Sequence, residues 1–134
     1  ETDEFAIGGS KVVRSSDQDK AVVVSAGITL HEALKAADRL QTQGTHIAVI
    51  DAYSIKPLDE KTIREFAGRT KHVIVVEDHY PAGGLGEAVR TALNNVQGVK
   101  CTHLAVSKIP RSGEPQELLH FEEIDAEAIV KAVV

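Results

Sequence analysis

Two carboxylates and an imidazole stand next to one another at Glu77, Asp78 and His79. They follow the apolar run Val73–Val76, and a glycine-rich turn comes next. In an open α/β sheet, ligands lie beyond the carboxyl ends of the strands, so chemistry is expected here. The three side chains could serve acid–base chemistry or hold a metal ion. Successive strand residues face opposite sides, however, so we favour a contact with a subunit or domain over a metal site.

The turn after this strand leads into a helical pattern and carries Gly83, Gly84, Gly86 and Glu87. Free amides at a helix N-terminus can bind phosphate, so a regulatory nucleotide- or phosphate-binding module is one hypothesis. The dinucleotide-binding fingerprint is incomplete, because Gly84-Leu85-Gly86 is not followed by its third glycine. The simpler interpretation is that the glycines adopt positive φ angles and let the helix pack close to the sheet.

A second candidate is Arg111 with Ser112, on a segment between two prolines. A guanidinium beside a hydroxyl can clamp an anion, although an arginine in such a loop is more often solvated or at an interface. Cys101 lies among strand-like residues, so we expect a buried thiol and not an activated nucleophile. The five histidines other than His79 show no metal-binding spacing and are interpreted as capping, strand-edge or surface residues: His31, His46, His72, His103 and His120.

Composition predicts a single globular domain over the 134 residues, with residues 1–20 as a lead-in. The net charge of −5 argues against nucleic acid, and no apolar run approaches the ~20 residues that span a membrane. A single cysteine is typical of a reducing compartment, which favours the cytoplasm. The chain has no methionine and begins at Glu1, so we expect a piece of a longer protein.

Apolar runs alternate with helical patterns along the chain, and the strands are expected at Ala21–Ala26, Ile47–Ile50, Val73–Val76 and Cys101–Val106. This alternation predicts a three-layer α/β/α sandwich with a mainly parallel sheet. Two short extended pieces around Gly8-Gly9, within Phe5–Arg14, are placed at a sheet edge, where one strand is expected to be antiparallel.

Capping signals predict where the helices begin and end. Thr29 and Glu32 match a capping box, and Gly44 is expected to end that helix. The next helix is expected to begin at Asp59, with a hydrophobic staple between Leu58 and Ile63, and to end at Gly68. The remaining helices are predicted over residues 85–96 and after a cap at Asp125, which a staple between Ile124 and Ile129 would support.

Four segments in register resemble the C-terminal domain of transketolase. They are Leu30–Leu34, Ile55–Asp59, Val76–Tyr80 with Gly83–Val89, and His103–Val106 with Pro110–Gly113. Each motif alone is weak, but together they cover nearly the whole chain, and the last favours transketolase over its relatives.

The resemblance implies a thiamine diphosphate and Mg²⁺ dependent transferase that moves a two-carbon ketol unit between sugar phosphates in the pentose phosphate pathway. It also implies a homodimer of three-domain subunits that holds its cofactor outside this third domain. The chain itself is therefore expected to have no catalytic, cofactor-binding or metal-binding residue, and to be inactive alone. Asn94-Asn95 lacks the upstream Gly-Asp-Gly that would complete a magnesium pyrophosphate site.

On this interpretation the domain serves dimer and domain assembly, through the region Glu77–Glu87 and the loop Pro110–Gly113. Two alternatives stay open. The glycine turn could bind a phosphate or nucleotide regulator. The parent could instead be the β subunit of a 2-oxoacid dehydrogenase or a deoxyxylulose phosphate synthase, relatives that typically lack the Pro-Arg-Ser-Gly segment.

Overall fold

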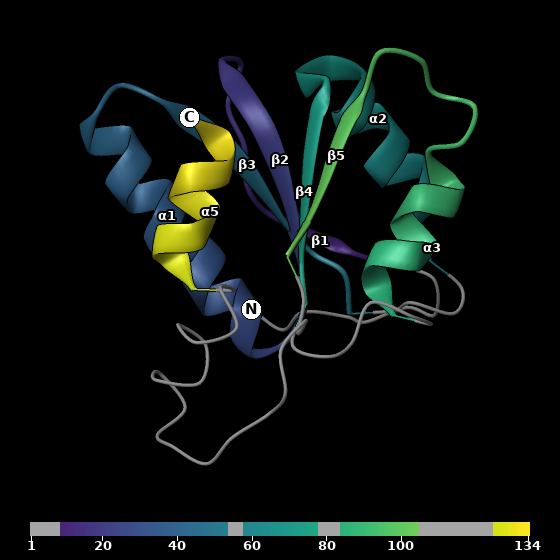
Figure 1. Cartoon of the computed structure of the whole chain (residues 1–134), viewed down its shortest axis with the longest axis horizontal. Coiled ribbons are helices and arrows are strands. Elements are labelled where there is room, and N and C mark those ends of the chain that lie inside the picture. The colour runs from purple at the N-terminus through teal and green to yellow at the C-terminus, as the bar shows by residue number, and fades with distance from the viewer. Residues whose placement is uncertain (1–8, 54–57, 78–83, 105–124) are drawn as a thin grey trace.

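A computed structural model describes residues 9–53, 58–77, 84–104 and 125–134 (Figure 1). Its strands are β1 (Lys11–Arg14), β2 (Asp19–Ser25), β3 (His46–Asp51), β4 (His72–Val76) and β5 (Lys100–Leu104). Its helices are α1 (Ile28–Thr42), α2 (Glu60–Thr70), α3 (Leu85–Ala92) and α5 (Ala126–Val133). In this described part of the chain, no helix has the length and apolar character needed to cross a membrane.

The five strands form one sheet in the order β1-β3-β2-β4-β5. β2 pairs in parallel with β3 and with β4, and β4 pairs in parallel with β5. Only β1 runs antiparallel, against β3 at the sheet edge. The predicted mixed sheet with one antiparallel edge strand is thus confirmed, while the first of the two expected extended pieces, Phe5–Gly8, lies outside the described residues.

Helices cover both faces of the sheet, with α1 and α5 on one side and α2 and α3 on the other (Figure 1). The continuous apolar strands explain this arrangement, because alternate side chains enter two separate cores. In β2, for example, Ala21 and Val23 pack against α1, whereas Val22 and Val24 pack against the opposite pair of helices. All four of these side chains are fully buried.

Local signals set most helix boundaries. Asp59 accepts from the amide of Thr62 at 3.3 Å and Asp125 accepts from that of Ala128 at 3.1 Å, so both predicted N-caps are confirmed. Gly44 ends α1 with a φ of 81°, and the amide of the following residue bonds to Leu40 O at 2.9 Å. This is the Schellman arrangement that glycine favours. Leu58 packs on the cluster containing Ile63, as the staple predicted, and Ile124 lies outside the described residues.

The capping box predicted at Thr29 is wrong. The N-cap of α1 is Gly27, which makes no side-chain cap bond. Thr29 lies inside the helix, and its hydroxyl is 3.0 Å from Val76 O on β4. Glu32 is only 3% exposed and accepts instead from the amide of Ala126 at 3.0 Å, which ties α1 to α5. Thr29 also bonds locally to Ala26 and Glu32 pairs with Lys35, but these bonds are not the reciprocal pair of a capping box.

Two further boundaries differ from the prediction. Gly68 does not end α2, which continues to Thr70 and is followed by Lys71 in the left-handed conformation. The last turn is held by its own contacts, since Thr70 donates to Phe66 O at 2.9 Å and Arg69 lies over the Phe66 ring. α3 is shorter than predicted and ends at Ala92, although Val96 still packs against the core from the turn that follows.

Candidate functional site

The predicted site lies at the carboxyl ends of β4 and β5, where Glu77 directly follows β4. The Glu77 side chain is only 2% exposed, although carboxylates are rarely buried unless they are paired. Other candidates from the sequence lie outside the described residues, namely Asp78, His79, Gly83, Arg111 and Ser112. Their predicted roles as interface or anion contacts stay predictions.

Glu77 caps helix α3. Its Oε1 accepts from the amide of Leu85 at 2.7 Å and its Oε2 accepts from that of Gly86 at 2.8 Å. The N-cap residue of this helix is Gly84, which offers no side chain of its own. A carboxylate from the preceding strand therefore supplies the negative charge that the helix N-terminus favours.

His103 closes the other side of the same carboxylate. It comes from β5, and its Nε2 bonds to Oε2 of Glu77. Since an ionised carboxylate only accepts, Nε2 carries the hydrogen. The His103 side chain is 7% exposed. The sequence had placed it among strand-edge or surface residues, so its burial beside Glu77 was missed. The parallel pairing of Val76 with Leu104 brings their chain neighbours Glu77 and His103 close together.

Gly86 is explained by this arrangement. A Cβ added there would lie 2.1 Å from Cε1 and Nε2 of the His103 ring, a separation that real Cβ atoms essentially never show. The predicted close packing of the turn on the sheet is confirmed at this residue. The predicted positive φ is wrong for Gly84, which has a φ of −101°, and for Gly86, which lies within α3. Close approach, not left-handed backbone, requires glycine at Gly86.

We call Glu77, His103 and the amides of Leu85 and Gly86 the carboxylate clamp. Its charge is enclosed by three N–H donors of the same chain. The two amides that a phosphate would need are already bonded to Glu77. The arrangement is suited to holding a strand, a helix and the next strand together, and unsuited to acid–base chemistry on a bound substrate.

The remaining candidates show no catalytic arrangement in the described residues. Glu87 is exposed on the first turn of α3. Cys101 is half-buried in β5, and burial raises the pKa of its thiol although Arg90 nearby acts to lower it. Within residues 9–53, 58–77, 84–104 and 125–134, no three His, Cys, Asp or Glu side chains group as metal ligands would.

Two features define the class of domain. The sheet is a doubly wound α/β sheet with one antiparallel edge strand, and the N-terminus of one helix is capped by a carboxylate from the strand before it. The family model described as transketolase, C-terminal domain, matches residues 10–129. The chain therefore belongs to the transketolase C-terminal domain family.

Individual relatives agree with this assignment. The chain is similar to transketolase from Homo sapiens, with 48% identity over 132 residues that cover 98% of this chain and 21% of the relative. Transketolase-like protein 1 from Bos taurus is 52% identical, with 98% of this chain and 22% of that protein covered. The chain thus spans about a fifth of the length of these curated relatives.

Two solved structures share the fold. A split-gene transketolase, described as an inactive beta4 tetramer, superimposes with a TM-score of 0.88 at 32% identity. That match covers 96% of this chain and 42% of the other chain. Transketolase from Campylobacter jejuni gives a TM-score of 0.64 at 18% identity, over 92% of this chain and 18% of that one, and supports the fold alone.

Proposed function

We propose that this chain is the C-terminal domain of a thiamine diphosphate and Mg²⁺ dependent transketolase, which transfers a two-carbon ketol unit between sugar phosphates in the pentose phosphate pathway. The observation that carries the proposal is the 48% identity to human transketolase across 98% of the chain. The alternatives of a 2-oxoacid dehydrogenase β subunit or a deoxyxylulose phosphate synthase are less favoured, because the similar proteins described above are transketolases and transketolase-like proteins.

Within the parent enzyme, we propose that the 134 residues form one domain that serves assembly and performs no chemistry. The carboxylate clamp supports this role, since its one buried carboxylate is saturated by N–H groups of its own chain. The similar split-gene protein is described as inactive and as a beta4 tetramer. That description fits a domain that associates without catalysing.

The partners that follow from the proposal are the other domains of the same subunit and a second subunit of a cytoplasmic homodimer. Thiamine diphosphate and Mg²⁺ would be held by those other domains, and this chain would bind neither. The predicted contact regions are Glu77–Glu87 and Pro110–Gly113. In the sequence they follow β4 and β5, the strands that the clamp connects.

The first experiment is an assay of this chain alone with xylulose 5-phosphate and ribose 5-phosphate, in the presence of thiamine diphosphate and Mg²⁺. We expect no ketol transfer. The same chain is then mixed with a separately produced protein that carries the other domains of the parent, and sedimentation and activity are measured. Association together with gained turnover supports an assembly role, whereas turnover by this chain alone contradicts it.

The alternative of a phosphate-binding glycine turn is disfavoured by one observation. The amides of Leu85 and Gly86 are bonded to Glu77 at 2.7 and 2.8 Å, so an anion would have to displace a carboxylate that is only 2% exposed. Displacement would leave that carboxylate buried against a second negative charge.

A further inference from the structure

A polar cavity lies at the opposite end of the sheet from the carboxylate clamp. Its volume is about 240 Å³, and it is lined by Arg14, Ser15, Ser16, Asp19, Ala37, Gln41, His46 and Ile47. These residues come from the end of β1, the connection to β2, the amino ends of β2 and β3, and the inner side of α1. The volume is below the roughly 300 Å³ at which pockets for drug-sized ligands begin, so it suits a small ion or group.

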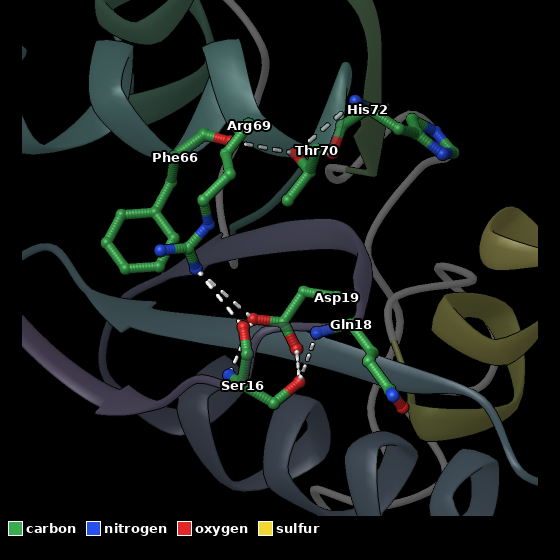
Figure 2. A network of polar contacts seen from close by, with 7 residues as sticks. All are labelled: Ser16, Gln18, Asp19, Phe66, Arg69, Thr70 and His72. Carbon is green, nitrogen blue, oxygen red and sulfur yellow. Dashed lines mark hydrogen bonds and ion pairs between the residues drawn. The ribbon is translucent and has the colours of Figure 1, made fainter.

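The buried carboxylate beside this cavity is already bonded within the chain. Asp19 is 1% exposed at its side chain, and it accepts from the amide of Ser16 at 2.8 Å and from the Ser16 hydroxyl at 2.6 Å. Arg69 reaches across from α2 to within 3.4 Å of its Oδ2, and the ring of Phe66 packs against that guanidinium (Figure 2). These donors offset part of the negative charge that Asp19 presents to the cavity.

Two cationic or hydrogen-donating groups remain available at the cavity. Arg14 is held by Asp38 at 2.5 Å and by Gln41, which together use two of the five N–H donors of a guanidinium. Asp38 is 75% exposed, so this ion pair is screened by water and an incoming anion can compete for it. The half-buried ring of His46 has no hydrogen-bond partner among the described residues.

We propose that this cavity binds a single oxyanion of the size of phosphate, with Arg14 and His46 as its principal donors. Ser15 is exposed at the same cavity and adds a hydroxyl donor. Ala37 and Ile47 also line the cavity, but at 2% and 3% exposure they offer a ligand little apolar surface. The ligand is either free phosphate or the phosphate group of a small monoester. The inference stands on this geometry and does not depend on the activity of the parent enzyme.

The test is a titration of the ¹⁵N-labelled 134-residue chain followed by amide shifts, with inorganic phosphate in one arm and glycerol 3-phosphate in the other, at constant ionic strength in sodium chloride. We expect saturable shifts at Ser15, Ser16 and His46, with a dissociation constant of millimolar order. Equal affinity in the two arms assigns binding to the phosphate group alone. Tighter binding of the ester shows that its carbon part also contacts the cavity. Absence of saturable shifts in both arms, or shifts confined to Leu85 and Gly86, overturns the proposal.

Variants sharpen the assignment. Arg14→Gln is expected to weaken binding about tenfold, the loss of one charge-assisted hydrogen bond, and His46→Gln about fivefold. The matched control is Arg39→Gln, which removes an exposed arginine from the last turn of helix α1 without changing a residue that lines the cavity. We expect the control to change affinity less than twofold. If Arg14→Gln does not fold, His46→Gln decides. Equal weakening by the control would show general charge attraction and contradict the proposal.

Discussion

At the carboxyl ends of β4 and β5, the buried carboxylate of Glu77 is bonded to groups 8, 9 and 26 residues away in the chain. At the amino end of β2, the buried carboxylate of Asp19 is bonded mainly to Ser16, three residues away. Both side chains are almost inaccessible, at 2% and 1% exposure. The first is satisfied by tertiary structure and the second by a local turn.

The difference has a consequence for stability. The clamp binds the carboxylate to parts of three elements at once, so losing it removes contacts that β4 makes to both α3 and β5. The Asp19 turn keeps its backbone geometry when the charge is lost, and Arg69, 49% exposed at its side chain, can return to water. We therefore expect changes at the carboxyl end of the sheet to cost more than matched changes at the amino end.

The largest effect is expected for Glu77→Gln. The amides of Leu85 and Gly86 each need an acceptor, and a glutamine side chain offers one oxygen and one NH₂ group that faces a donor. We expect the free energy of unfolding to fall by about 3 kcal/mol, measured by urea denaturation. The control is Glu87→Gln, an exposed carboxylate on the same helix, with an expected change within about 0.5 kcal/mol. A loss below about 1 kcal/mol for Glu77→Gln would remove the proposed difference between the two ends.

The second effect concerns the close approach of Gly86 to His103. We expect Gly86→Ala to destabilise the chain by about 2 kcal/mol, because the new methyl group would overlap the imidazole ring. In a His103→Ala background the same change should cost less, giving a coupling energy of about 1 kcal/mol in a double-mutant cycle.

The matched control for this cycle is Gly68→Ala. Gly68 also lies within a helix, but nothing is within 4 Å of an added Cβ there. Alanine should therefore stabilise α2 by up to about 1 kcal/mol through helix propensity. Additive behaviour of Gly86→Ala and His103→Ala would mean that the ring is not what excludes a side chain at residue 86.

A smaller effect is expected for Asp19→Asn at the amino end. The asparagine oxygen can still accept from the Ser16 amide, and the Ser16 hydroxyl can turn to accept from the new NH₂ group, so the main loss is the charge facing Arg69. We expect a destabilisation of about 1 kcal/mol in urea denaturation. High salt should narrow this difference between the variant and the parent sequence, because it screens the ion pair in the parent. A loss of stability equal to that of Glu77→Gln would contradict the proposed difference between the carboxyl and amino ends of the sheet.

The smallest effect is a pH dependence at His72, at the start of β4. Burial lowers the pKa of His72, and Lys100 beside it lowers it further. Its ring also bonds to the Thr102 hydroxyl at 3.2 Å. As the pH falls, the unfolded chain takes up a proton at this histidine before the folded chain does. The contribution of neutral His72 to the free energy of unfolding is therefore complete above the ordinary pKa of about 6.5 and is lost as the pH falls below that value.

We expect His72→Gln to flatten the loss of stability between about pH 7.5 and 5.5. The measurement is a series of urea denaturations across this range. Asp59 does not interfere: burial would raise its pKa, but hydrogen bonds from Thr62 and Ser10 hold it below 3.8, outside the window. An unchanged pH profile in His72→Gln would show that another group titrates.

Prediction from the sequence succeeded where neighbouring residues decide the outcome. The caps at Asp59 and Asp125 and the left-handed Gly44 follow from side-chain and backbone bonds within a single turn. It failed at Thr29, where the capping spacing was correct but the hydroxyl lies against Val76 O of a neighbouring strand. It failed again at Gly68, where α2 continues for two more residues, Arg69 and Thr70, which both contact Phe66.

The candidate site was also predicted only in part. The sequence singled out Glu77 and the glycine turn, and the structure places Glu77, Gly84 and Gly86 together at the carboxyl end of β4. It did not predict that His103 would complete the group. A histidine within a strand carries no local signal for burial, and only the parallel pairing of β4 with β5 brings the His103 ring to Glu77.

The sequence by itself determined the alternation of strands and helices, the mixed sheet and the family, because periodicity, capping and motif order are properties of nearby residues. Tertiary structure alone decided which groups neutralise the buried carboxylate of Glu77, and it added a distant donor to Glu32, which the nearby Lys35 also neutralises at 2.7 Å. The amide that Glu32 binds lies 94 residues away, at the start of the last helix. A buried charge accepts whichever donors the folded chain brings within about 3 Å, and sequence spacing does not record that distance.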